Sequence, residues 1–192
     1  KKFFADNSID YVILAAAKVG GISHNAAHPA EFIYDNLQIQ NNVIHYAYKS
    51  NVKKLLFLGS ACIYPKVTEQ PIKEDSLLTS TLEPTNEAYA LAKIAGLKMG
   101  QFYFQQYGFN VVSVMPANLY GPGDNFHLST SHVIPALLRK FDTAKNSNSP
   151  EVICFGDGSP IREFLHVSDL ADACIFIMNE YNSPKHINIG SD

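Results

Sequence analysis

Runs of apolar residues alternate with longer segments of helical periodicity along this 192-residue chain. Tyr11–Ala17 is apolar throughout, a shorter apolar run occupies Leu55–Leu58, and Phe109–Met115 is mainly apolar. An apolar run without alternation is typical of a strand covered on both faces, as in a parallel sheet. The pattern predicts three buried strands here, and shorter strands at Val152–Phe155 and Ile187–Ile189.

Helical periodicity fills the intervals between these runs. Pro29 suits the first turn of one helix, whereas Gly108 is expected to end another. The predicted helices span residues 29–50, 87–107, about 131–145 and 168–181, the last capped by Ser168, and residues 1–4 resemble the tail of a further helix. The apolar face of the first long helix is predicted to carry Ile33, Leu37, Ile44 and Tyr48.

This alternation of strands and helices predicts βαβ units with right-handed crossovers. The expected fold class is therefore α/β, a Rossmann-like doubly wound parallel sheet. The stretch from Gly121 to Arg162 departs from the alternation and predicts part of a smaller lobe. We expect one Rossmann-like domain over residues 1–120, the smaller lobe over 121–162, and a return to the first domain over 163–192. The polar, proline-bearing stretch 65–86 is long enough to suggest a functional loop.

Composition narrows the class of protein. Apolar residues make up 46% and charged residues 17%, which suits a packed core. The net charge of -3 argues against nucleic acid or an anionic membrane as the partner. No apolar run approaches the roughly 20 residues that span a bilayer. Three scattered cysteines, Cys62, Cys154 and Cys174, predict neither a disulfide framework nor a metal site, so a reducing, cytoplasmic setting is expected.

The glycine-rich turn that usually holds a dinucleotide is missing from this sequence. Gly20-Gly21 follows a predicted strand without a third glycine, and the pairs at Gly121 and Gly156 have the spacing of plain turns. From these residues alone, cofactor binding is not established. Both ends look cut from something longer.

One group of residues has the types and the spacing of a catalytic site. Tyr89 and Lys93 lie four residues apart on a predicted helix, and Ser60 follows the carboxyl end of a predicted strand, where open α/β sheets place ligands. An ammonium group one turn away is expected to lower the pKa of the phenol toward working pH. The alternative is an exposed lysine beside a packed tyrosine.

Several segments together resemble the GDP-L-fucose synthase family of the extended short-chain dehydrogenase/reductase superfamily. The resemblance covers essentially the whole chain and is carried by residues 14–22 (LAAAKVGGI), 57–65 (FLGSACIYP), 82–93 (LEPTNEAYALAK), 115–122 (MPANLYGP), 131–138 (SHVIPALL) and 162–167 (REFLHV). In that family a glycine-rich NADP loop precedes the position of Lys1. The sheet would then lack its N-terminal βαβ unit here, and the chain by itself is expected to be inactive.

The resemblance implies an enzyme with oxidoreductase and isomerase activities that uses NADPH. It would convert GDP-4-keto-6-deoxy-D-mannose to GDP-L-fucose by 3,5-epimerisation and 4-reduction. Ser60, Tyr89 and Lys93 match the catalytic triad, and Cys62 and His132 match the acid-base pair of the epimerisation. Without the resemblance, Cys62 reads as a small buried residue, and His132 reads equally as a helix cap or a functional group.

The resemblance also implies binding positions. Those for NADP(H) are Leu58, Gly59, Ser60, Ala61, Lys93, Pro116, Ala117, Asn118, Leu119 and His132. Those for the GDP-sugar are Lys140, Phe155 and Arg162, and the positive charges of Lys140 and Arg162 suit a diphosphate. Without the resemblance, a solvated helix face is the favoured interpretation of Lys140. Two departures stand out: Ala61 replaces a serine that is frequent in the family, and Phe155 replaces a tryptophan.

A homodimer is expected, because equivalent helices of this superfamily pair into a four-helix bundle. The helices at 29–50 and 87–107 carry apolar residues beyond one stripe, namely Ile94, Leu97, Met99, Phe102 and Phe104. The alternative is that these residues pack under the second lobe.

Two other functions remain open. One is another nucleotide-sugar enzyme of the superfamily, although a 4,6-dehydratase would carry an Asp-Glu pair where Ala61-Cys62 stands. The other is a non-catalytic NADP sensor on the same scaffold, against which the retention of Ser60, Tyr89 and Lys93 speaks.

Overall fold

The computed structural model describes residues 1–128 and 130–191. Within them, the main sheet has four parallel strands in the order β1 (Tyr11–Leu14), β2 (Lys54–Leu58), β3 (Val111–Pro116) and β6 (Ile187–Ile189). The register pairs Leu14 with Phe57 and Leu58 with Val114. The carboxyl ends of these strands therefore meet at one edge of the sheet, as the predicted Rossmann-like α/β fold requires.

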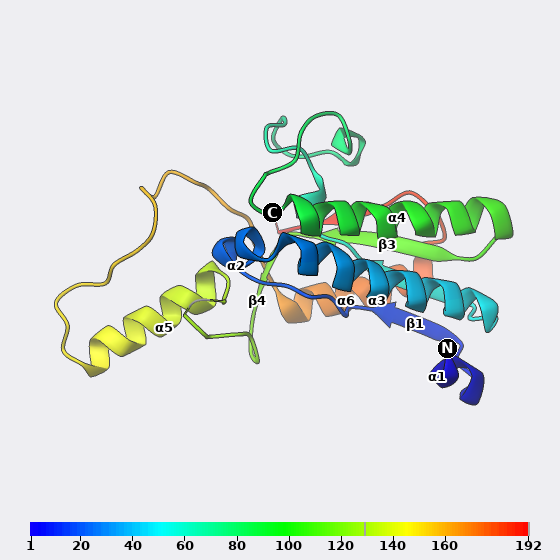
Figure 1. Cartoon of the computed structure of the whole chain (residues 1–192), viewed down its shortest axis with the longest axis horizontal. Helices are drawn as coiled ribbons and strands as arrows, with labels where there is room; N and C mark the ends of the chain where they lie inside the picture. Colours follow the sequence, from blue (N-terminus) through cyan, green and yellow to red (C-terminus); the bar gives the residue numbers. More distant parts are fainter. Residues whose placement is uncertain (129, 192) are drawn as a thin grey trace.

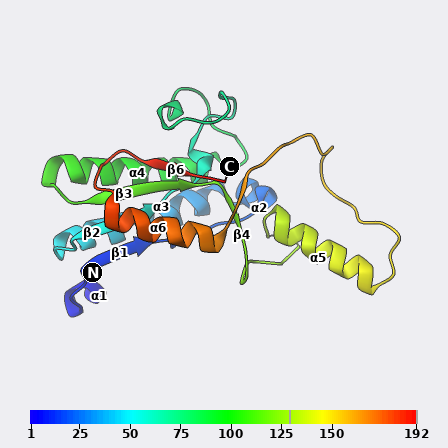
Figure 2. The same cartoon turned by 180° about the vertical axis from the view of Figure 1, so that it is seen from behind.

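Helices cover both faces of this sheet. The long helices α3 (Pro29–Lys49) and α4 (Glu87–Tyr107) lie side by side on one face, and α6 (Val167–Glu180) lies on the other (Figures 1 and 2). The predicted bounds of α4 are confirmed, because Gly108 follows it in the left-handed conformation with φ 66°. The short helices α1 (Lys2–Asp6) and α2 (Ile22–Ala27) flank β1 along the chain.

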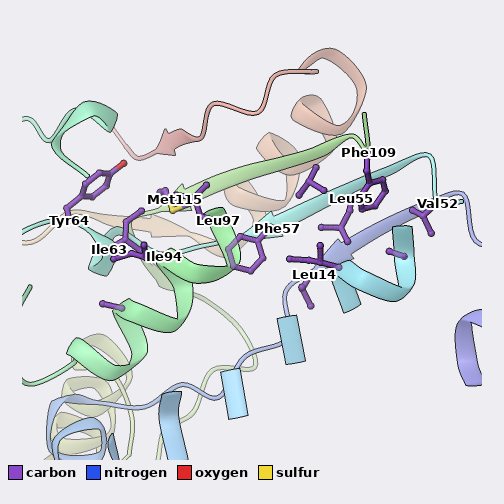
Figure 3. Close-up of a cluster of buried hydrophobic side chains, with 14 of the residues drawn as sticks. Leu14, Val52, Leu55, Phe57, Ile63, Tyr64, Ile94, Leu97, Phe109 and Met115 are labelled. Carbon is purple, nitrogen blue, oxygen red and sulfur yellow. The ribbon is translucent and has the colours of Figure 1, made fainter. Parts of the chain in front are cut away.

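Two hydrophobic clusters hold these layers together. Alternate residues of β2 point to opposite faces, so Leu55 and Phe57 pack toward α3 and α4, whereas Leu56 packs toward α6. Figure 3 shows the larger cluster, in which Leu97 of α4 and Met115 of β3 are almost completely buried. The larger cluster extends past the end of β2, where it also takes in residues of the following turn.

The first strand departs from the sequence-based expectation. It ends at Leu14 rather than Ala17, and it is not covered on both faces, since Tyr11 and Ile13 are 60% and 53% exposed. β1 is an edge strand of the sheet in this chain, and α6 covers β2 and β3 instead. The apolar run therefore predicted the presence of the strand, but it did not predict that one face of the strand is exposed.

The buried face of α3 also differs from the prediction. Ile44 is fully buried as expected, but Ile33, Leu37 and Tyr48 are only half-buried. The deepest stripe instead contains Phe32, Asn36, Gln40, Ile44 and Ala47. Two polar residues on this stripe made the apolar pattern point slightly away from the true buried face.

The second half of the chain contains elements that the pattern did not predict. β4 (Asn118–Tyr120) and β5 (Phe164–His166) pair in parallel as a separate two-stranded sheet. Between them, α5 (Val133–Asn146) and the following loop extend away from the main sheet (Figure 1). This excursion occupies the range predicted for the smaller lobe; the domain division itself stays a prediction.

Two local predictions in this half are wrong. Val152–Phe155 is not a strand, because the segment is largely exposed and pairs with no described strand; Phe155 is 91% exposed. Ser168 does not cap α6: the cap is His166, whose Nδ1 accepts a hydrogen bond from the Ser168 main-chain nitrogen at 3.3 Å. A β-type run without a neighbouring strand gains no ladder hydrogen bonds and stays irregular.

The long loop between β2 and α4 contains two single 3-10 turns, η1 (Ala61–Ile63) and η2 (Glu74–Ser76). Across the described residues, no helix is long and apolar enough to cross a membrane.

Candidate active site

A turn at the carboxyl end of β2 presents Ser60. Its side-chain oxygen accepts a hydrogen bond from the Cys62 main-chain nitrogen at 3.3 Å, which starts η1. Gly59 approaches β3 so closely that a Cβ there would collide with Met115, and its nitrogen donates to the Val114 oxygen at 2.8 Å. Glycine therefore lets the turn sit against the neighbouring strand without a shift of the Met115 side chain.

The first turns of α4 bring Tyr89 and Lys93 to the same place. The Lys93 ammonium donates a hydrogen bond to the Leu58 main-chain oxygen at 2.8 Å, and it lies 5.8 Å from the centre of the Tyr89 ring. The Ser60 side chain interacts with the Tyr89 hydroxyl. The structure thus brings together the three residues predicted as a triad, whose catalytic roles stay a prediction.

Burial has the largest effect on the pKa values of Lys93 and Tyr89. Loss of solvation lowers the pKa of Lys93 to about 8. Burial also raises the pKa of Tyr89, with a smaller contribution from nearby Cys62, whereas hydrogen bonding to Ser60 opposes the rise. The expectation that Lys93 lowers the pKa of Tyr89 is therefore not met. The ammonium points to the Leu58 carbonyl, and the low-polarity surroundings dominate the phenol.

Cys62 and His132 occupy different situations. Cys62 is a half-buried free thiol in η1, close enough to Tyr89 to affect its pKa. His132 is exposed and precedes α5 without a capping hydrogen bond from its side chain. A hydrogen bond from the Gly21 nitrogen to the Thr130 oxygen, 3.2 Å, holds the start of this region to the segment after β1. No hydrogen bond among the described residues joins His132 to Cys62.

The positions predicted to line the cofactor lie on two neighbouring strand ends. Leu58 ends β2 and is followed by Gly59–Ala61, whereas Pro116 ends β3 and is followed by Ala117 and by the start of β4 at Asn118 and Leu119. Ala61 and Asn118 are exposed, and Ser60 is half-buried, so this edge offers main-chain and hydroxyl groups to a ligand. An ammonium has three N–H groups, and Lys93 directs one of them to Leu58, so it can also bind a ribose hydroxyl. These residues fit a dinucleotide.

The three predicted substrate residues are only partly brought together. The Lys140 ammonium lies 4.2 Å from the centre of the Phe155 ring and donates to the Ile153 oxygen at 2.8 Å. Arg162 is exposed, and its guanidinium donates to the oxygen of its neighbour Ile161 at 2.8 Å. Lys140 and Phe155 therefore form one unit, whereas the bond of the exposed Arg162 goes to its own neighbour in the chain.

Sequence reasoning missed two buried polar residues of α3, one that holds the segment after β1 and one that bonds next to Lys93. Asn36 is 2% exposed and bonds both main-chain groups of Lys18, with its Oδ1 2.9 Å from the nitrogen and its Nδ2 3.0 Å from the oxygen. Gln40 donates to the Ala92 oxygen at 2.6 Å, next to Lys93. The available signal was their spacing with Phe32 and Ile44, which places all four on one helical face.

The chain is similar to known proteins over almost its whole length. Residues 1–190 match the NAD dependent epimerase/dehydratase family. The chain is 61% identical to GDP-L-fucose synthase 1 of Arabidopsis thaliana, over 100% of this chain and 59% of that protein. It is 57% identical to the GDP-L-fucose synthase of Escherichia coli K12, over 98% of this chain and 62% of that protein.

A solved structure has a similar fold. The chain superposes with a TM-score of 0.89 on a GDP-L-fucose synthetase from Naegleria fowleri bound to NADP, at 33% identity, covering 100% of this chain and 62% of that one. The chain thus spans about three fifths of the length of the relatives it matches. On the match over residues 1–190, this chain belongs to the NAD dependent epimerase/dehydratase family.

Proposed function

We propose that the natural polypeptide containing this chain converts GDP-4-keto-6-deoxy-D-mannose to GDP-L-fucose, with NADPH as the reductant. The observation that carries the proposal is the meeting of Ser60, Tyr89, Lys93 and Cys62 at the carboxyl edge of the sheet. The high identity to proteins named GDP-L-fucose synthases supports the choice of substrate.

The reduction uses the triad. Bound NADPH supplies a hydride to C4 of the keto sugar. Tyr89 donates its phenolic proton to the C4 oxygen, and its raised pKa keeps that proton in place until the oxygen becomes basic. The Ser60 hydroxyl holds the same oxygen. Lys93, protonated at neutral pH because its pKa is about 8, holds the end of β2 through the Leu58 oxygen and would bind a ribose hydroxyl of the cofactor.

The epimerisation uses Cys62 and His132. The C4 carbonyl makes the hydrogens on C3 and C5 acidic, so a base can remove each proton and leave an enolate. An acid on the opposite face then returns a proton to the same carbon, which inverts it. A thiol and an imidazole have ordinary pKa values of about 8.5 and 6.5, both suited to proton transfer near neutral pH.

The binding residues follow the same arrangement. Leu58–Ala61, Lys93, Pro116–Leu119 and His132 would hold the cofactor. Lys140, Phe155 and Arg162 would hold the GDP-sugar, with the two cations on the diphosphate and the ring against the base. The contact between Lys140 and Phe155 supports a shared role for these two residues.

We further propose a homodimer formed by α3 and α4. Three of their apolar side chains support this, because Tyr34, Leu91 and Phe102 are 62%, 43% and 59% exposed. Ile94 and Leu97 do not contribute, since both are buried in the core of the chain itself. A monomeric mass in light scattering of the natural polypeptide at micromolar concentration would contradict the dimer.

A cytoplasmic location fits the need for a reduced Cys62 thiol.

The amount of NADPH oxidised per sugar converted tests the proposed function. The natural polypeptide, given GDP-4-keto-6-deoxy-D-mannose, is expected to oxidise one NADPH for each sugar. A 4-epimerase or a dehydratase would consume no net NADPH, and a sensor would bind the cofactor without converting the sugar. Either of these results would reject the proposal.

A further inference from the structure

The turn that carries Ser60 and Cys62 is fixed at both of its ends. At its start, Gly59 bonds to Val114 of β3. At its end, Tyr64 is 4% exposed and packs in the larger hydrophobic cluster. Ser60, Ala61 and Cys62, which lie between these ends, are half-buried or exposed. The turn therefore offers only its middle to a ligand.

The fixation at Tyr64 comes from the last strand of the sheet. The Tyr64 hydroxyl points out of the cluster toward β6, and it donates a hydrogen bond to Asn188 Oδ1 at 2.5 Å (Figure 3). Burial raises the pKa of Tyr64, so the hydroxyl stays protonated and remains a donor. Tyr64 lies two residues after Cys62, and its nitrogen donates to the Ala61 oxygen at 3.2 Å within the same turn.

Asn188 uses its other groups on the same loop. Its Nδ2 donates to the Ile72 oxygen at 3.0 Å, and its main-chain nitrogen donates to Glu74 Oε1 at 2.9 Å. One residue of β6 thus joins three points of the loop that follows Ser60. Its place in the sheet is itself fixed, because β6 pairs in register with β3 at Met115.

We infer that Asn188 is a positioning residue, which holds the Ser60–Cys62 turn in its reactive geometry through the Tyr64 hydroxyl. Without this bond the end of the turn keeps the packing of the Tyr64 ring and the main-chain bond to Ala61 but loses its link to β6, so the half-buried Cys62 becomes accessible more often. The inference rests on the proposed function for the roles of Ser60 and Cys62, but its structural part can be measured without any substrate.

The test compares the alkylation of two cysteines in the natural polypeptide. Iodoacetamide modification is followed by mass spectrometry at Cys62, and the exposed Cys154 serves as the internal reference. Tyr64→Phe removes one oxygen and keeps the packed ring, so it is the variant least able to disturb folding. Tyr181→Phe is the matched control, since it removes a hydroxyl that donates to the Lys185 oxygen at 3.0 Å, far along the chain from the turn.

Tyr64→Phe and Asn188→Ala are each expected to raise the Cys62 rate roughly fivefold relative to Cys154, the scale of one lost hydrogen bond. The relative Cys62 rate in the double variant should equal that in the faster single variant, because both changes remove the bond between Tyr64 and Asn188. An unchanged ratio in both single variants, an equal rise in Tyr181→Phe, or effects that multiply in the double variant would overturn the inference.

Turnover separates this inference from the proposed function. In Tyr64→Phe, kcat should fall at least roughly tenfold while KM for NADPH stays within about twofold, as expected of a misplaced catalytic group. A fall in KM and kcat together with unchanged alkylation would reject the positioning role. One outcome combines the expected rise in Cys62 alkylation in the variants with no turnover by the wild-type protein. In that case the proposed function fails and the role of Asn188 in holding the turn stands.

Discussion

The Lys93 ammonium and the Leu58 main-chain oxygen lie 2.8 Å apart, joined by a hydrogen bond that ties α4 to the end of β2. Lys93 is 4% exposed, and no carboxylate contributes to its pKa. The bond fixes the ammonium beside Tyr89 at the cost of its solvation. The same group is therefore suited to the site and unfavourable for stability.

This relationship predicts how stability depends on pH. The pKa of Lys93 is about 8 in the folded chain and near 10.5 when unfolded, so the unfolded chain binds more protons between these values. The free energy of unfolding should then rise with pH from about 8 to about 10, by up to roughly 1 kcal/mol per pH unit. Urea unfolding of wild type and Lys93→Met at pH 7.5 and 9.5 measures this. The rise should be absent from the variant; equal slopes in both proteins would contradict the pKa.

Tyr89→Phe should separate the two half-reactions. The ring packing survives, but the proton donor is lost, so NADPH oxidation should fall by at least about 10²-fold, the usual scale for general acid catalysis. Exchange of solvent deuterium into C3 or C5 should continue, because the enolate forms without hydride transfer. The measurement is NADPH absorbance alongside NMR of the sugar, and an unchanged reduction rate would remove Tyr89 from the mechanism.

Cys62→Ser should have the opposite effect. It keeps the size of the side chain but replaces the thiol with a much weaker acid, so exchange at C3 or C5 should fall while the Tyr89 group remains intact. NMR of the sugar in deuterium oxide, with NADPH withheld, reports this exchange. Cys154→Ser is the matched control, because that cysteine is exposed on the loop between α5 and β5. Wild-type exchange at both carbons in Cys62→Ser would return Cys62 to the role of a core residue.

Replacing Lys54 is expected to change the free energy of unfolding through its buried hydrogen bonds. Its side chain is buried and donates to the main-chain oxygens of Ile177, Met178 and Tyr181 at 3.0, 2.6 and 2.7 Å, which joins β2 to the end of α6. Lys54→Met should lower the free energy of unfolding by at least about 2 kcal/mol, because buried carbonyls lose their donor.

The adjacent lysine provides the control for that experiment. Lys53 forms an exposed ion pair with Asp10 at 2.9 Å, so Lys53→Met should leave unfolding in urea unchanged. Equal effects of the two substitutions would mean that the Lys54 hydrogen bonds add nothing to stability.

Local signals in the sequence predicted the elements that depend on local causes. α4 was bounded correctly because a glycine suited to the left-handed conformation follows Tyr107, and the three main strands were found from their apolar runs. The strand predicted at Val152–Phe155 failed because a strand exists only where a partner strand lies beside it. β4 and β5 were missed for another reason: they pair only with each other, 46 positions apart in the chain, and no local pattern reports that pairing.

The site was predictable only in part. Ser60, Tyr89 and Lys93 could be placed together from strand-end position and helical spacing. The residues that bond beside them, Gln40 and Asn188, read as ordinary polar residues, because their partners lie far away in the sequence. The pKa of Tyr89 likewise depends on burial that spacing cannot report.

The labelling pattern of the product tests the proposed function most directly. The natural polypeptide is incubated with GDP-4-keto-6-deoxy-D-mannose and NADPH in deuterium oxide, and the product is examined by NMR. We predict GDP-L-fucose with deuterium at C3 and C5 and protium from NADPH at C4. A product that retains protium at C3 and C5 with unchanged configuration would contradict the epimerase-reductase assignment.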